Sequence, residues 1–130
     1  MVTVGLKGRA EGIVTKENTA LAAGSGSLEV FATPHMVALM EKAACAALDG
    51  ALEAGQSSVG TRMDVAHSSA TPVGMRVWAE SELVAAEGKK LCFSVRAYDE
   101  CGLIGEGTHE RFVIGAERFL QKCYAKLEDR

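Results

Sequence analysis

The chain has 130 residues, enough for one domain with a sizeable core and too few for two independent domains. Apolar residues make up 48% and charged residues 24%, proportions typical of a globular protein and not of a disordered one. The net charge is only -3, no basic run exceeds two residues and no apolar run could span a bilayer, so composition argues against nucleic-acid binding and a membrane role.

The four cysteines, Cys45, Cys92, Cys101 and Cys123, are irregularly spaced and form no Cys-x-x-Cys pair. No histidine lies close enough to complete a zinc knuckle, so no metal site is expected. The N-terminal stretch has basic residues without an apolar segment after them, which argues against a secretory signal. We therefore interpret the cysteines as reduced, buried thiols of a cytoplasmic protein.

Residues 4–15 are dotted with glycine and weakly alternating, which predicts a strand, and 23–27 (AGSGS) reads as a flexible joint. A long apolar helix follows. Thr33 is a favoured N-cap residue and Pro34 is favoured at the first helical position, so the helix is predicted to begin there. Glycines within residues 49–55, at Asp49-Gly50 or one turn later, provide the stop.

This helix carries one polar stripe, formed by His35, Lys42 and Asp49. These residues are seven positions apart and therefore nearly coincide when viewed down the helix axis. Glu41 lies off that stripe, among Ala, Val and Cys neighbours. A carboxylate buried there is costly without a partner, and catalytic acids, bases and nucleophiles are often found in such places. The pattern leaves two interpretations open: a functional group, or a side chain at the edge of the buried face that reaches water.

The next part of the chain changes to a period of two, which is typical of strands. Four alternating segments lie at 59–69, 73–87, 90–100 and 103–115. Short turns between them predict an antiparallel meander, and 116–130 returns to helical spacing with its apolar residues on one side. The sequence therefore predicts a single α+β domain over residues 1–130, in which a curved sheet wraps the apolar helix and covers it on nearly all sides.

His67 ends the apolar face of the first of these segments. It is either a hydrogen-bonded core residue or, paired with a carboxylate such as Glu41, an acid/base catalyst. Thr33 is likewise either a helix cap or a hydroxyl that binds or attacks an acyl carbonyl near free backbone N-H groups. We also expect β-bulges at Gly60 and Gly107 rather than close ligand approach.

Three neighbouring residues, His109, Glu110 and Arg111, are interpreted as cross-strand surface pairs. No phosphate-binding loop, dinucleotide motif or metal-ligand spacing is present in the sequence.

Three segments together resemble the fluoroacetyl-CoA thioesterase-like family of hotdog-fold acyl-CoA thioesterases. They are 30-VFATPHMVALMEKAAC-45, 58-SVGTRMDVAHSSATPVGM-75 and 105-GEGTHERFVI-114. The resemblance runs from about residue 28 to residue 120. It implies a hotdog fold, an acyl-CoA substrate, no metal or organic cofactor, and a homodimer or higher homo-oligomer with active sites at the subunit interface.

Carried over by position, the resemblance implies that Thr33, Glu41 and His67 are the catalytic threonine, glutamate and histidine. Gly60 matches a glycine whose backbone N-H positions the acyl group, and Arg111 matches an arginine near the active site. Thr33 and Glu41 are eight residues apart, about 12 Å along a regular helix. We therefore expect either that Thr33 folds back from the helix axis or that the site draws residues from two subunits.

One departure concerns the acyl group. The fluoroacetyl-specific family has a longer, Phe-containing segment before the first motif, whereas this chain has 24-GSGSLE-29 and no aromatic residue before Phe31. We expect hydrolysis of a small or short-chain acyl-CoA without strict fluoroacetyl selectivity. The alternative is a non-catalytic hotdog protein that binds acyl-CoA to sense or sequester it; a hydratase is disfavoured because its Asp/His arrangement is not visible.

Overall fold

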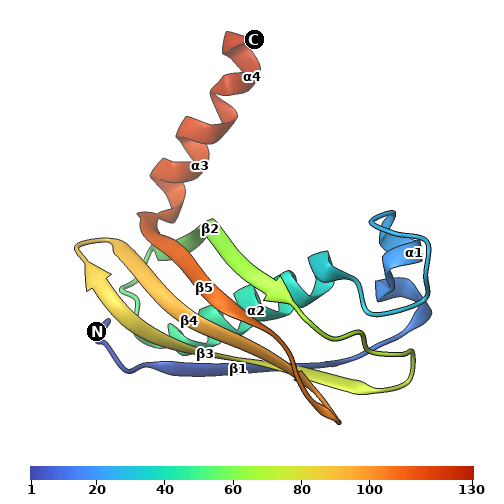
Figure 1. Ribbon diagram of the computed structural model, residues 1–130. Coiled ribbons are helices and arrows are strands. Elements are labelled where there is room, and N and C mark those ends of the chain that lie inside the picture. The colour runs from blue at the N-terminus through green and yellow to red at the C-terminus, as the bar shows by residue number, and fades with distance from the viewer.

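The computed structural model describes residues 1–130 and shows one curved antiparallel sheet with a long helix across one face (Figure 1). The strands are β1 (Lys7–Ile13), β2 (Gln56–His67), β3 (Arg76–Glu87), β4 (Lys90–Asp99) and β5 (Gly102–Gly115). The helices are η1 (Lys16–Asn18), α1 (Ala20–Ala23), α2 (Thr33–Ala47), α3 (Ala116–Tyr124) and α4 (Lys126–Asp129). The predicted α+β architecture is confirmed, and η1 and α1 are additions that the sequence did not suggest.

The sheet order is β1-β3-β4-β5-β2, with every neighbouring pair antiparallel. The two hairpins that join β3, β4 and β5 confirm the predicted turns, but the four-strand meander is wrong because β2 pairs with β5 at the far edge. Residues 68–75 are therefore a crossover and not a hairpin turn. The crossover is held by a buried hydrogen bond from Thr71 Oγ1 to Asp99 Oδ2 at 2.8 Å.

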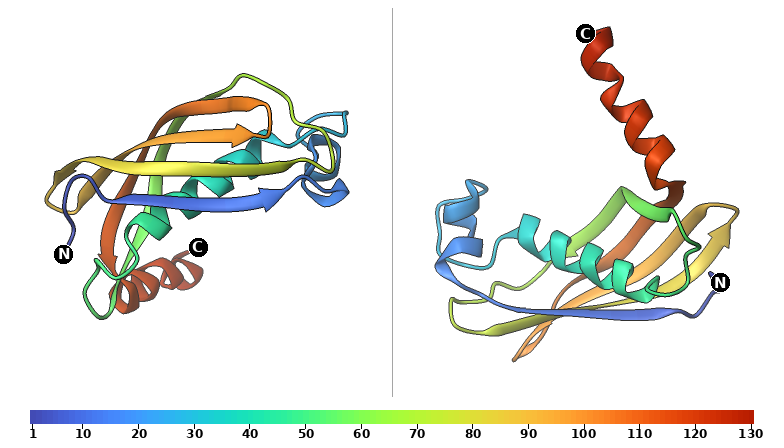
Figure 2. Two further views of the ribbon diagram at one scale, coloured as in Figure 1. Left: turned by 90° about the horizontal axis from the view of Figure 1, so that it is seen from below. Right: turned by 180° about the vertical axis from the view of Figure 1, so that it is seen from behind.

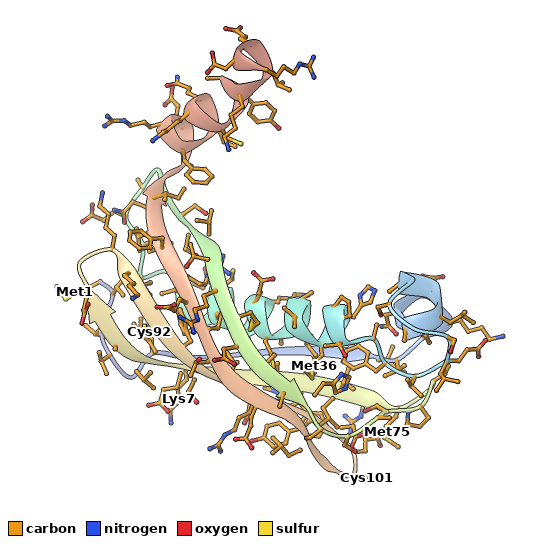
Figure 3. All side chains as sticks on the ribbon, turned by 45° about the horizontal axis from the view of Figure 1, so that its top comes forward. Met1, Lys7, Met36, Met75, Cys92 and Cys101 are labelled. Atoms are coloured by element: carbon orange, nitrogen blue, oxygen red, sulfur yellow. The ribbon has the colours of Figure 1, made fainter.

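The inner face of α2 packs on the sheet and forms the core. Its buried residues are Met36, Met40, Ala43, Ala44 and Ala47. Small residues let the strand and helix approach closely: a Cβ at Gly8 of β1 would run into the carbonyl of Ala43 and the backbone of Ala47. Met36 lies between α2 and the sheet (Figure 3).

The other face of α2 is not covered by the sheet, so the expectation that the helix is enclosed on nearly all sides is wrong for the isolated chain. Pro34, Ala38, Lys42 and Cys45 are exposed there. A sheet of five strands has only one concave face to offer, and it meets one side of the helix (Figure 2).

The ends of α2 differ slightly from the prediction. Ala32 occupies the N-cap position without a side-chain cap bond, and Thr33 and Pro34 are the first two helical residues. The cap role of Thr33 is therefore wrong, and its hydroxyl is free for another partner. The helix ends at Ala47 and turns at Gly50, whose φ of 77° is left-handed, which confirms the earlier of the two predicted stops.

The C-terminal helices α3 and α4 confirm the helical spacing but project away from the body of the domain (Figures 1 and 2). No residue of either helix is buried. The large apolar residues of this arm are exposed: Phe119, Leu120, Tyr124 and Leu127. None of the helices combines the length and apolar character needed to cross a membrane.

The cysteines are not core residues, contrary to the prediction. Cys45, Cys101 and Cys123 are exposed, Cys92 is half-buried, and all four are free. The prediction rested on the general tendency of cysteine to be buried. Here α2 leaves Cys45 on its uncovered side, Cys101 lies in a turn, and Cys123 lies in the projecting arm.

Candidate active site

The N-terminal end of α2 meets the end of β2 at one polar contact. Thr33 Oγ1 lies 2.7 Å from His67 Nδ1, and this pairing of first helical turn with last strand residue joins two of the predicted catalytic residues. The other ring nitrogen, Nε2, is buried and has no hydrogen-bond partner in the chain. A buried polar atom without a partner is costly, so His67 has an unused hydrogen-bonding position.

Burial lowers the pKa of His67 below its ordinary value of 6.5, and the nearby Ser69 backbone opposes this shift only in part. The imidazole is therefore neutral at neutral pH. In one tautomer Nδ1 accepts a hydrogen bond from the Thr33 hydroxyl and Nε2 carries the proton. In the other tautomer Nδ1–H donates to Thr33 and Nε2 offers a lone pair; both arrangements suit proton transfer.

A second cluster lies further along α2. The Glu41 side chain is 42% exposed, and its Oε2 atom is 3.5 Å from Arg111 Nη1, while the Arg111 side chain is only 7% exposed. Glu41 therefore sits at the edge of the buried face, as one of the two interpretations held. A Cβ added to Gly60 would come within 2.5 Å of the same carboxylate oxygen.

Gly60 reaches this position through a β-bulge. The register of β2 against β5 shifts between Gly60 and Arg62, which confirms the bulge and turns Gly60 onto the inner face. The bulge predicted at Gly107 is wrong: Gly107 lacks a side chain because the β2 backbone at Asp64 and Val65 lies against it.

Arg111 is held by several groups besides Glu41. Its Nε donates to Ser58 Oγ at 2.9 Å, its Nη2 donates to the Ser58 carbonyl at 3.0 Å, and its Nη1 lies 3.3 Å from His109 Nε2. The interpretation of residues 109–111 as surface pairs is therefore wrong for Arg111 and His109. It is right for Glu110, which pairs with Lys90 at 3.0 Å on the outer face.

Ser58 and His109 were not predicted as site residues from the sequence. The available signal was the two-residue spacing of His109, Arg111 and Val113, all of which are buried on the same face of β5. The apolar residues Phe112 and Ile114 masked that signal, because they alternate equally well and suggest the opposite face as the inner one.

Within one chain the two clusters are separate. Helix α2 runs without interruption from Thr33 to Ala47, so Thr33 and Glu41 are about two turns, or about 12 Å, apart along its axis. The expectation that Thr33 folds back is wrong. One chain thus presents the Thr33–His67 pair and the Glu41–Arg111–Gly60 group as two separate polar clusters.

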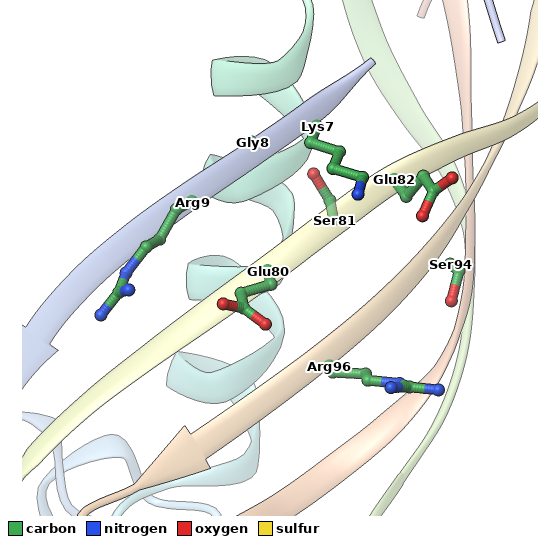
Figure 4. Close-up of a pocket in the computed structure, with 8 residues that line it drawn as sticks. All are labelled: Lys7, Gly8, Arg9, Glu80, Ser81, Glu82, Ser94 and Arg96. Carbon is green, nitrogen blue, oxygen red and sulfur yellow. The ribbon is translucent and has the colours of Figure 1, made fainter. Parts of the chain in front are cut away.

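Two pockets of the surface lie apart from Thr33, Glu41, His67 and Arg111. A pocket of 510 Å³ lies over β1, β3 and β4, on the face of the sheet away from α2, and its lining is entirely polar or glycine (Figure 4). Its charged side chains are Lys7, Arg9, Glu80, Glu82 and Arg96. A second pocket of 260 Å³ lies beside Cys45 and reaches Ser58, the residue that anchors Arg111.

Known proteins share both sequence and fold with the chain. The family model of the fluoroacetyl-CoA-specific thioesterase matches residues 14–117. The fluoroacetyl-CoA thioesterase of Streptantibioticus cattleyicolor is 47% identical over 98 residues, which are 75% of this chain and 70% of that protein. A solved structure of a fluoroacetyl-CoA thioesterase superposes with a TM-score of 0.90 at 38% identity, covering 97% of this chain and 98% of the other.

A variant of that enzyme in complex with fluoroacetate and CoA gives a TM-score of 0.84 at 39% identity over 91% of this chain and 99% of the other. A thioesterase superfamily member of Thermus thermophilus gives 0.89 at 29% identity over 100% of this chain and 96% of the other. The fold and the residues on it define the class of hotdog-fold thioesterases. Within this class, the chain belongs to the fluoroacetyl-CoA-specific thioesterase family, which confirms the resemblance read from its motifs.

Proposed function

We propose that the protein is an acyl-CoA thioesterase that hydrolyses a small or short-chain acyl-CoA to the free acid and CoA. Besides family membership, one observation carries this proposal: a neutral histidine, His67, is bound to a hydroxyl through Nδ1 while Nε2 is buried and unpartnered. Such a nitrogen is ready to exchange a proton with a substrate, a water or a carboxylate.

Glu41 supplies the carboxylate in either of two routes. In the covalent route, the Glu41 carboxylate attacks the thioester carbonyl carbon, the carbon–sulfur bond breaks, and CoA leaves as a thiolate. Water then hydrolyses the acyl-glutamyl anhydride, while His67 takes a proton from that water and passes it to the CoA thiolate. In the direct route, Glu41 takes a proton from water as the water attacks, and His67 relays that proton from Glu41 to the leaving sulfur.

Thr33 and Gly60 serve the acyl group in this proposal. The Thr33 hydroxyl, fixed by His67, polarises or attacks the carbonyl, and the backbone N-H of Thr33, which has no partner in the chain, lies beside it. Gly60 leaves room for the Glu41 carboxylate and offers its backbone N-H to the acyl oxygen, while Arg111 orients Glu41 from the buried side.

The proposed assembly is a homodimer in which Glu41 of one subunit completes the Thr33–His67 pair of the other. Thr33 and Glu41 lie at equal distances on either side of Val37 in the sequence. A twofold axis near Val37 would therefore place Thr33 of each subunit beside Glu41 of the other subunit. Three unused surfaces support a second copy: the free edge of β2, the exposed face of α2 and the apolar side of the C-terminal arm.

The acyl group is proposed to be small, with no strict demand for fluorine. Residues 24–29 are exposed beside the end of α2 that carries Thr33, and they contain no aromatic side chain to close over it (Figure 1). Leu28 is the one large apolar residue there and is 67% exposed. A cytoplasmic location is part of the proposal, because four free cysteines, three of them exposed, suit a reducing compartment.

The test is a panel of acyl-CoAs of increasing chain length, read by a thiol-detecting dye. We expect turnover of short acyl chains by the wild type, and losses of about a hundredfold or more in kcat for Glu41→Gln and His67→Gln. Glu53→Gln and His35→Gln are matched controls outside both clusters. Tight acyl-CoA binding by the wild type without release of CoA from any member would instead establish the non-catalytic alternative.

The two chemical routes are separated by a single turnover in ¹⁸O-labelled water. Attack by Glu41 can leave the label in its own carboxylate, which mass spectrometry of the peptide would detect. Label found only in the released acid after repeated single-turnover trials supports direct attack by water.

A further inference from the structure

A histidine that no proposed chemical step uses lies behind the Glu41 cluster. His109 is 1% exposed and projects from β5 towards the Gly60–Arg62 bulge of β2. Its ring is tilted against Phe93 of β4, with the ring centres 6.2 Å apart. The groups of other elements that face it are therefore the Arg62 carbonyl, Phe93 and the Glu41 carboxylate, with Arg111 next to it on its own strand.

The hydrogen bonds of His109 fix its tautomer. Nδ1 lies 2.8 Å from the Arg62 carbonyl oxygen, which can only accept, so Nδ1 carries a proton and donates it. Nε2 faces Arg111 Nη1 at 3.3 Å, and a guanidinium can only donate, so Nε2 offers its lone pair. Both partners require the same neutral ring, and a doubly protonated ring would oppose donor to donor at Nε2.

The charges around the ring favour the same state. Burial lowers the pKa of His109, as does the nearby Arg111 cation, while the Arg62 carbonyl and the Glu41 carboxylate oppose the shift. The β2 bulge creates the arrangement, because it aims the Arg62 carbonyl at His109 and turns Gly60 towards Glu41 within three residues.

We propose that His109 is a positioning residue of the active site: as a neutral imidazole protonated on Nδ1, it accepts a hydrogen bond from Arg111 and thereby fixes where Arg111 holds the Glu41 carboxylate. This inference rests on the proposed catalytic role of Glu41. Arg111 Nη1 is the shared atom, 3.3 Å from His109 and 3.5 Å from Glu41, so a change at Nε2 is transmitted to the carboxylate through a single guanidinium nitrogen.

The first test needs no substrate and no substitution in the measured protein. In ¹⁵N-histidine-labelled wild type at neutral pH, nitrogen NMR should show His109 with a protonated Nδ1 and an unprotonated Nε2; loss of that signal in His109→Gln assigns it. An imidazolium, or a ring protonated on Nε2, would overturn the proposal.

The second test is kinetic. His109→Phe keeps a ring against Phe93 and removes both nitrogens, and we expect kcat to fall by about 10- to 100-fold with a smaller change in KM, since misplacement of a reacting group acts mainly on the chemical step. His109→Gln can present an acceptor oxygen near the Nε2 position and should lose less. His35→Phe is the control at a histidine outside the cluster.

A double variant separates positioning from general structural damage. If His109 acts through Glu41, then adding His109→Phe to Glu41→Gln should lower kcat by less than about twofold further. An equal loss in both backgrounds would show that His109 does not act through Glu41 and would overturn the proposal. Should Glu41→Gln itself retain wild-type turnover, the proposed catalytic role of Glu41 fails, while the NMR result still decides the state of His109.

Discussion

Gly60→Ala adds one methyl group at the closest point of approach between β2 and the Glu41 carboxylate. The new Cβ would meet Glu41 Oε2 at 2.5 Å, while ordinary contact begins near 3.4 Å, so the carboxylate must retreat by about 0.9 Å. The methyl would also lie 3.2 Å from His109 and 3.4 Å from Arg111, so these buried side chains prevent the methyl from moving away from the carboxylate. The backbone N-H of residue 60 is unchanged, so the substitution tests position alone.

A displacement of about 1 Å of a reacting group can lower the rate by about a hundredfold, or about 2.7 kcal/mol in activation free energy. We expect kcat for a short acyl-CoA to fall by about that factor, with KM changed by less than about threefold. The melting temperature should change little, because the group that moves is the terminal carboxylate of Glu41, whose side chain is half-exposed.

Gly12→Ala in β1 is the matched control. Its Cβ would meet only Val77 Cγ2 at 3.9 Å, an ordinary contact, and it lies away from both clusters. A Gly60→Ala enzyme that keeps kcat within about twofold of the wild type, while Gly12→Ala behaves in the same way, would refute the reasoning that places the Glu41 carboxylate at the reacting centre.

Three further predictions follow from contacts of the same chain. Thr33→Val should lower kcat by about 10- to 100-fold without loss of stability, because Thr33 does not cap its helix, and Thr33→Ser should retain most activity; steady-state kinetics and thermal unfolding check both. The acid limb of kcat/KM should lie below pH 6.5, because burial lowers the pKa of His67, and a limb above pH 6.5 would contradict the assignment. Because the unfolded chain binds a proton at His67 more readily than the folded chain, the free energy of unfolding should also fall as the pH drops through that range. Gly8→Ala should destabilise the fold by about 1–3 kcal/mol in urea, because its methyl meets the backbone of α2 at Ala43, while Gly12→Ala should not.

Much of the fold was predictable from periodicity. The hairpins of β3, β4 and β5 followed from alternation broken at Glu87-Gly88 and near Gly102, both of which are turns in the structure. The position of β2 was not predictable in the same way, because the turn-like sequence 68–75 looks like a hairpin and is a crossover. Local composition reports that the chain changes direction there, but not which strand it pairs with afterwards.

The residues of the candidate site also differ in how far the sequence could predict them. Glu41 and His67 stood out because each interrupts an apolar pattern of one element, and the structure places each in a polar cluster. His109 and Ser58 did not stand out, because their roles depend on contacts across two strands and on the bulge at Gly60. The role of Thr33 was left open between helix cap and reacting hydroxyl for a similar reason: its hydroxyl is engaged by a residue 34 positions away and not by its own helix.

The claim at the centre of this account is that each active site joins Thr33 and His67 of one subunit to Glu41 of the other. Mixing Glu41→Gln and His67→Gln subunits by joint refolding or co-expression tests it most directly. Random pairing makes half of the dimers mixed, and each mixed dimer regains one of its two sites, so the account predicts about a quarter of wild-type activity from two inactive parents. A mixture in which mass spectrometry detects mixed dimers but activity stays at the level of the separate variants would contradict it.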